Sequence, residues 1–76
     1  MNNKQRKEID KALGLLSQAL SIIETLKDEE REKADNLTDA LQATEKGQKI
    51  EEAASALENA HSSLEDVIGS LETVKE

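Results

Sequence analysis

Apolar residues recur along two stretches of the chain at alternating intervals of three and four residues. The first stretch holds Ile9, Leu13, Leu16, Leu20 and Ile23, and the second holds Ile50, Ala53, Leu57, Ala60, Leu64, Val67, Leu71 and Val74. This spacing puts side chains on one side of an α-helix. The sequence therefore predicts two long amphipathic helices, at about residues 4–35 and 45–74, each with one apolar seam.

The chain is expected to reverse between the helices, at about residues 36–44. Thr44 is the best N-cap for the second helix, and Asn36 or Thr38 is placed to cap a short turn. That turn is expected to put three apolar residues over the end of the helices as a plug: Leu37, Ala40 and Leu41. Gly47 is expected to be a weak point in the first turn of the second helix. The predicted fold is all-α, a single domain over residues 1–76 that forms an antiparallel two-helix hairpin.

A second apolar line remains on the first helix after its seam is assigned: Ala12, Leu15, Ala19, Ile22 and Leu26. The second helix has a thinner flank beside its own seam, made of Ala54, His61 and Ile68. Two helices cannot cover all of these lines at once. We therefore expect the hairpin to self-associate into a helical bundle, or to bind a target protein, through one set of residues: Leu15, Ala19, Ile22, Leu26, His61 and Ile68.

The composition supports a need for a partner. The chain has 76 residues, no cysteine and no aromatic residue. Domains of this size rarely gain enough stability from one core without disulfides, metal ions or oligomerisation. The sequence contains neither a long apolar run typical of a membrane span nor the apolar core of a signal peptide. These features predict a soluble protein of the cytoplasm with no membrane partner.

The net charge of −7 is unevenly distributed along the chain. Residues 1–27 carry five basic and three acidic side chains, whereas residues 28–76 carry five basic and fourteen acidic ones. Such a surface disfavours direct binding to nucleic acid and favours a basic protein surface. Four glutamates recur every seven residues as an acidic column: Glu51, Glu58, Glu65 and Glu72. This column is either a docking face for a basic protein surface or a face that only keeps the protein soluble.

The sequence offers little catalytic chemistry. His61 is the only histidine, and without cysteine or a second histidine it makes a poor metal site. A histidine at the edge of an apolar face is more often a satisfied interfacial residue. No glycine-rich phosphate loop or nucleophile–base pair accompanies the serines and threonines. We therefore expect a non-enzymatic protein that uses no cofactor.

The segment from Asp28 to Ala53 resembles a pattern in small acidic helical-hairpin proteins encoded by phages and prophages of Gram-positive bacteria. The most specific matches are Asp35-Asn36-Leu37, Leu41-Gln42 and Gly47. Thr38 stands where the pattern has proline, and Ala34 stands where it has an aromatic residue. The resemblance implies a phage origin, and proteins of that kind often act by occupying host proteins.

Three functions follow as hypotheses. The first is a protein-interaction module, such as a phage-encoded inhibitor that occupies a host defence or nucleic-acid-processing protein. The second is a structural or assembly bundle without an inhibitory role. The third is an oligomeric sponge for a small anionic ligand, which would use the only basic cluster in the chain: Lys4, Arg6, Lys7 and Lys11.

Overall fold

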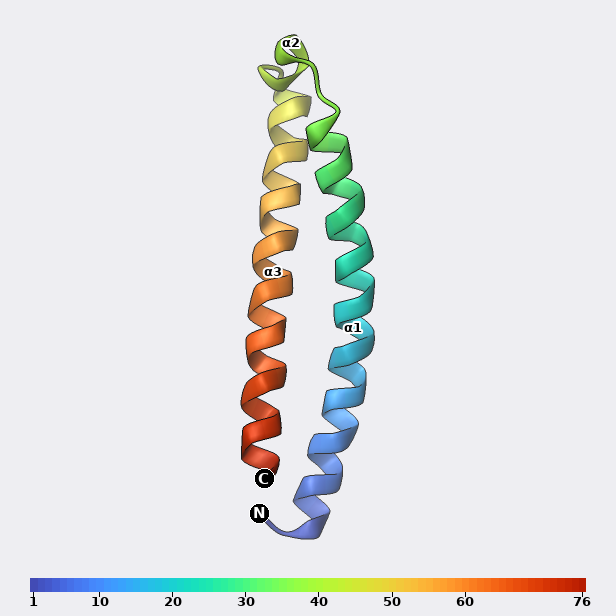
Figure 1. Ribbon diagram of the computed structural model, residues 1–76, viewed down its shortest axis with the longest axis vertical. Coiled ribbons are helices and arrows are strands. Elements are labelled where there is room, and N and C mark those ends of the chain that lie inside the picture. The colour runs from blue at the N-terminus through green and yellow to red at the C-terminus, as the bar shows by residue number, and fades with distance from the viewer.

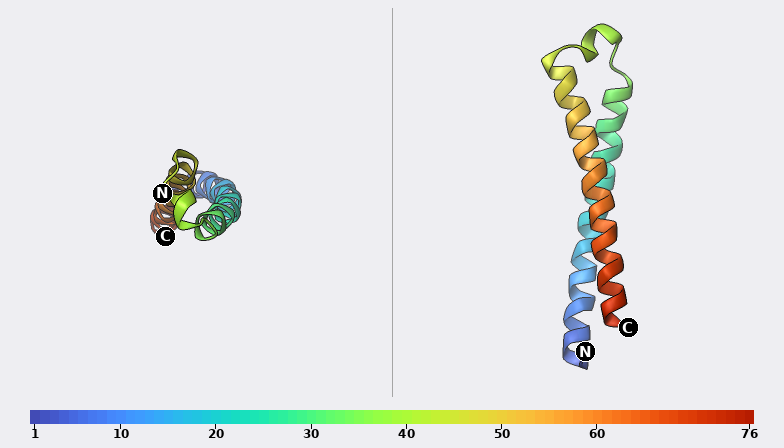
Figure 2. Two further views of the ribbon diagram at one scale, coloured as in Figure 1. Left: turned by 90° about the horizontal axis from the view of Figure 1, so that it is seen from above. Right: turned by 90° about the vertical axis from the view of Figure 1, so that its left-hand side faces the viewer.

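The fold is all-helical, and two long helices pack against each other along their length. The computed structural model describes residues 1–76 as α1 (Asn3–Asp35), α2 (Asp39–Gln42) and α3 (Glu45–Lys75). The two chain ends lie at one end of the molecule and α2 lies at the other, which gives a hairpin-like rod (Figure 1). The rod measures 58 × 15 × 14 Å. The two long helices wind gently around each other (Figure 2).

Each helix begins at a residue whose side chain caps it. The Asn2 side chain accepts a hydrogen bond from the Gln5 backbone N–H at 2.7 Å, and the Gln5 side chain accepts one from the Asn2 N–H at 3.1 Å. Thr38 caps α2, and Thr44 caps α3 by accepting a hydrogen bond from the Gly47 N–H at 3.0 Å. These side chains satisfy amide groups that have no partner within the helix. The prediction of Thr44 as the N-cap of the second long helix is confirmed.

Residues 27–33 are charged all round, and this pattern predicts an end that frays or projects into solvent, held only by ion pairs such as Asp28 with Arg31 and Glu29 with Lys33. The structure contradicts both expectations, because α1 is helical to Asp35 and neither pair forms. Arg31 instead reaches across to α3, and Lys33 pairs with Glu30 at 2.8 Å. The cross-helix contacts anchor this end of α1 against α3.

The seam between the long helices is half-buried along most of its length. On α1 it follows the predicted positions, from Ile9 to Ile23, and it continues through Lys27 to Ala34. On α3 the seam consists of Ile50, Ala54, Leu57, His61, Leu64, Ile68, Leu71 and Lys75. Four of these residues belong to the predicted seam, but Ala54, His61 and Ile68 were expected on its flank.

The predicted seam of the second helix is therefore wrong. In the structure α3 is rotated about its own axis, so that a neighbouring row of residues faces α1. Ala60, Val67 and Val74 were expected in the seam, and they are exposed. The apolar pattern of α3 allows either rotation, because both rows beside the shared Ile50 row contain apolar or small residues: one includes Ala60 and Val67, and the other includes Ala54 and Ile68. The observed rotation turns the acidic column toward Arg31 and so allows the cross-helix ion pairs.

The interior of this rod is thin. Only Ala34, Gly47 and Ala54 are buried, and no large side chain is fully buried. The expected plug over the end of the helices is incomplete: Leu37 is half-buried, whereas Leu41 is 51% exposed and Ala40 is exposed as well. Most of the apolar side chains of the chain thus remain in contact with solvent.

None of the three helices combines the length and apolar character needed to cross a membrane.

Candidate functional site

One side of the helix pair is held together by charge. Arg31 donates from Nε to Glu58 at 2.6 Å, and its Nη1 lies 3.3 Å from Glu51. The hydrogen bond to Glu58 raises the pKa of the Arg31 guanidinium. Both glutamates directly follow a seam residue of α3, and Arg31 directly follows the seam residue Glu30 of α1. The flanks that follow the seam in each helix therefore lie on the same side of the hairpin.

Charged contacts also close the end where the termini meet. Lys75 Nζ lies 2.9 Å from Asp10, and this hydrogen bond raises the pKa of Lys75. Arg6 Nε donates to the Lys75 carbonyl oxygen at 3.2 Å. These contacts and the Arg31 contacts hold both ends of the long helices in register.

The opposite side of the helix pair is apolar, and we call it the apolar face. It is formed by the flank that precedes the seam in each helix, together with the outer positions of α1. Its members are Ala12, Leu15, Ala19, Ile22 and Leu26 of α1 and Ala53, Ala60, Val67 and Val74 of α3. No charged residue lies on this flank of α1 between Glu8 and Glu29, and Glu8, Glu29 and Lys33 border the apolar face at its two ends.

The large side chains of the apolar face are open to solvent. Leu15 is 61% exposed, Ile22 63%, Leu26 44%, Val67 46% and Val74 53%. Isolated exposed apolar residues are ordinary on protein surfaces, but a continuous patch on a soluble protein usually marks a binding surface. The apolar face is therefore the candidate functional site.

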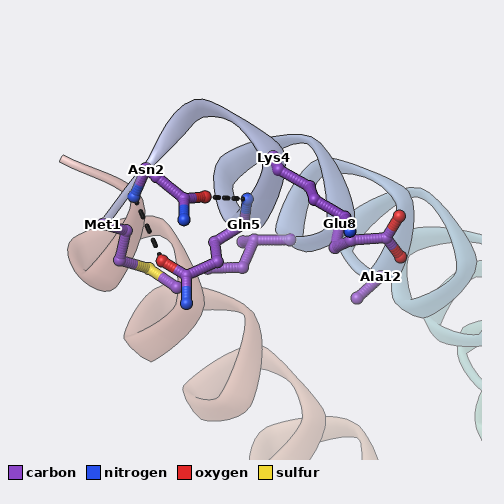
Figure 3. Close-up of a pocket in the computed structure, with 7 residues that line it drawn as sticks. Met1, Asn2, Lys4, Gln5, Glu8 and Ala12 are labelled. Carbon is purple, nitrogen blue, oxygen red and sulfur yellow. Dashed lines mark hydrogen bonds between the residues drawn. The ribbon is translucent and has the colours of Figure 1, made fainter.

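A shallow hollow lies at each end of the apolar face. The hollow at the open end has a volume of about 530 Å³ and is lined by Met1, Gln5, Glu8, Ile9 and Ala12 among others (Figure 3). Its floor includes the hydrogen-bonded pair Asn2 and Gln5. The hollow at the turn has a volume of about 410 Å³ and includes Leu41 and Ile50. The two hollows extend the apolar face toward both ends of the rod.

The structure divides the residues predicted to bind a partner. Leu15, Ile22 and Leu26 lie exposed together on the apolar face. Ala19 is half-buried at the inner edge of the same face. His61 and Ile68 lie elsewhere, half-buried in the seam between α1 and α3.

The acidic column is largely occupied by internal contacts. Arg31 binds Glu51 and Glu58, and Glu65 lies 3.2 Å from Nδ1 of His61. Glu72 is the one member of the column without a salt bridge. A basic partner would have to compete with these contacts, which makes the acidic column a weaker candidate than the apolar face.

The remaining polar residues do not assemble a site. Of the basic cluster proposed for an anionic ligand, only Lys4 lines a hollow, while Arg6 is bound to the Lys75 carbonyl. No group of three or more histidine and carboxylate side chains is placed to hold a metal ion. His61 has only 15% of its side chain exposed, and Glu65 is the carboxylate nearest to its Nδ1.

Sequence reasoning missed the contribution of α3 to the apolar face. Ala60, Val67 and Val74 had been assigned to the seam because their spacing of seven residues fits a helical seam equally well. The signal that could have separated the two rotations is the charge of Arg31 and the acidic column. If those charges are required to meet, only one rotation of α3 remains, and it turns Val67 and Val74 outward.

Comparisons with known proteins give no match: no family model, no curated protein and no solved structure is similar to this chain.

Proposed function

We propose that this chain is a non-enzymatic protein-interaction module, an antiparallel helical hairpin that binds another protein chain through its apolar face. The observation that carries the proposal is the exposure of five large aliphatic side chains on one continuous side of both helices. Between Ala12 and Leu26 this side has no charged residue, whereas the opposite side carries the Arg31 ion pairs. A helix pair with one apolar side and one charged side usually packs the apolar side against another element and leaves the charged side in water.

The limited burial of apolar side chains within one hairpin also supports a binding partner. Burial of apolar surface contributes roughly 25 cal/mol per Å², and a fully buried leucine or isoleucine contributes about 1.5–3 kcal/mol. In the single hairpin no large side chain reaches full burial. A partner that covers Leu15, Ile22 and Val67 would supply burial that the seam alone does not provide.

The resemblance to phage-encoded proteins extends the proposal to a host protein as one class of partner. An apolar partner surface fits this site better than a basic one, because the acidic column is mostly engaged by Arg31 and His61. The structural bundle remains the alternative role, and it would use the same face.

Site-specific photo-crosslinking tests the proposal in cells that produce the full chain. A photoreactive amino acid replaces Ile22 on the apolar face in one sample. In the matched control it replaces Gln18, which is an exposed residue on the outer side of the same helix. We expect discrete protein adducts from position 22, and we expect Leu15→Gln with Val67→Gln to remove them.

The absence of adducts from position 22, or equal adducts from both positions, would contradict the proposal. An adduct with a second copy and an adduct with a different protein both agree with an interaction module. The mass of the adduct separates these two cases.

A further inference from the structure

The charged contacts at the two ends fix the relative heights of α1 and α3. Lys75 reaches both Arg6 and Asp10, so its height lies between those two residues. Arg31 reaches two glutamates that are seven residues apart on α3, so its height lies between them. Both helices rise about 1.5 Å per residue, and counting inward from either anchor therefore gives the height of every residue between them.

At each level of the apolar face, a large side chain on one helix lies beside a small one on the other. Counting from the Lys75 contacts makes Ile22 level with His61, and counting from the Arg31 contacts makes it level with Ser63 or Leu64. Ile22 is therefore level with Ser63 to within about two residues. The other level pairs are Leu26 with Ala60, Ala19 with Val67, Leu15 with Ser70, and Ala12 with Val74. Ser63 and Ser70 are exposed and border the face on α3. The large side chains of the face thus come from α1 at some levels and from α3 at others.

We propose that the occupant of the apolar face is a second copy of this chain, related to the first by a two-fold axis along the hairpin. This inference rests on the proposed role of the apolar face in protein binding. A rotation about such an axis keeps every residue at its height and puts α1 of one copy over α3 of the other. Each large side chain then meets a small one on the partner copy, for example Ile22 over Ser63 and Val67 over Ala19. Large residues facing small ones let two layers interdigitate without voids.

The alternative two-fold axis, perpendicular to the hairpin, would put α1 over α1 and α3 over α3. Leu15, Ile22 and Leu26 would then crowd one side of the bundle. The α3 side would bring together mainly alanine and serine, since its only large members are Val67 and Val74. The unequal bulk of the two helices therefore favours the axis along the hairpin.

The charge pattern of the face also suits a second copy. A two-fold interface pairs one patch with itself, so every charge on the patch is brought near an identical charge. Between Ala12 and Leu26 on α1 and the level residues of α3, the apolar face contains no charged residue, and Glu8, Glu29 and Lys33 lie only at its ends. Self-pairing therefore brings no like charges together at its centre.

The size of the face is close to the minimum for a dimer. It is about 30 Å long on α3, from Ala53 to Val74, and about 21 Å long on α1, from Ala12 to Leu26, and each helix is about 10 Å wide. This gives about 500 Å² for each copy and about 1,000 Å² in total, which is about the smallest area of a specific protein interface. The product is a four-helix bundle in which each helix has antiparallel neighbours.

Sedimentation equilibrium on the purified chain tests whether the second copy binds. We expect a dimer, and we expect Leu15→Gln with Ile22→Gln to weaken it at least about tenfold. Lys11→Gln with Gln18→Ala is the matched control, because both residues are exposed and outside the face. Circular dichroism reports whether each variant is helical. A helical wild-type monomer at all concentrations would overturn the proposal, as would a dimer that the face variant leaves intact.

Disulfide formation tests the orientation, and the chain has no cysteine of its own. An equal mixture of Ile22→Cys and Ser63→Cys chains is expected to form mainly the mixed disulfide, with little product from either variant alone. A strong product from Ile22→Cys alone would overturn the proposed axis, because it would mean that α1 lies over α1. A monomer that still gives position 22 adducts with another protein would refute only the second copy. A monomer without adducts would refute the proposed function as well.

Discussion

Gly47 lies so close to the backbone carbonyl of Leu41 that there is no room for a Cβ atom. The same carbonyl accepts a hydrogen bond from the Thr44 hydroxyl at 2.6 Å, and that hydroxyl accepts one from the Gly47 N–H. Thr44 and Gly47 together hold α2 against the first turn of α3. Gly47 was expected as a weak point of the helix, and the structure gives it a packing role that the sequence did not show. Its missing side chain is what allows the close approach.

Gly47→Ala is expected to lower the free energy of unfolding by about 1–3 kcal/mol, the usual effect of overpacking a tight site. The added methyl group would meet backbone atoms, which cannot move as a flexible side chain can. Chemical denaturation followed by circular dichroism measures the change, at one protein concentration for all variants because association affects stability.

Gly14→Ala is the matched control for this substitution. A Cβ at Gly14 would meet nothing within 4 Å, and alanine favours the helix by up to about 1 kcal/mol. We expect this variant to be more stable than the wild type. Equal stability of the Gly47 and Gly14 variants would mean that the Leu41 carbonyl moves aside freely.

His61→Leu is expected to raise the free energy of unfolding by about 1 kcal/mol, because a polar residue at a seam position weakens helix pairing. His61 is half-buried in the seam, in line with Leu57 and Leu64. Thermal unfolding measures the effect. His61→Gln keeps a polar group and should show no gain. A loss of stability in the leucine variant would show that the contact between His61 and Glu65 contributes more than an apolar side chain in the seam.

Arg31→Gln is expected to lower the melting temperature, and more at low salt than at high salt. Arg31 bridges two glutamates across the helices, and all three side chains are partly exposed, so salt screens the contact. Lys11→Gln removes the same charge from a residue without an ion pair and serves as the control. The same loss in both variants would attribute the effect to net charge rather than to the bridge.

The end where the termini meet is expected to loosen at high pH. The hydrogen bond to Asp10 raises the pKa of Lys75, so the folded state holds this proton more tightly than the unfolded state. The contact therefore stabilises fully below the ordinary lysine value of about 10.4 and is lost as the pH rises through the raised pKa. Amide hydrogen exchange is too fast for this range, so the distance between spin labels on the two ends is the suitable measurement. Lys75→Gln should remove the pH dependence, and a dependence that persists would assign it to another group.

Local signals in the sequence were enough for the helices themselves. Asn36, Thr38 and Thr44 mark the region in which the chain turns, and the threonines cap the helices that follow. The exposure of Leu15 and Ile22 could also be predicted, because α1 carries more apolar residues than one neighbouring helix can cover. The tight contact at Gly47 could not, since it depends on where α2 folds back in space.

The sequence by itself determined two amphipathic helices, the threonine caps, and an excess of apolar surface on α1, because these follow from spacing and from hydrogen bonds over three or four residues. Only the tertiary structure decided which flank of α3 enters the seam. The row from Ile50 to Leu71 has apolar or small neighbours on both flanks, so periodicity along one helix leaves its rotation open. Contacts with the other helix remove that freedom. Arg31 binds the acidic column on one side, and this turns Val67 and Val74 outward beside Leu15 and Ile22.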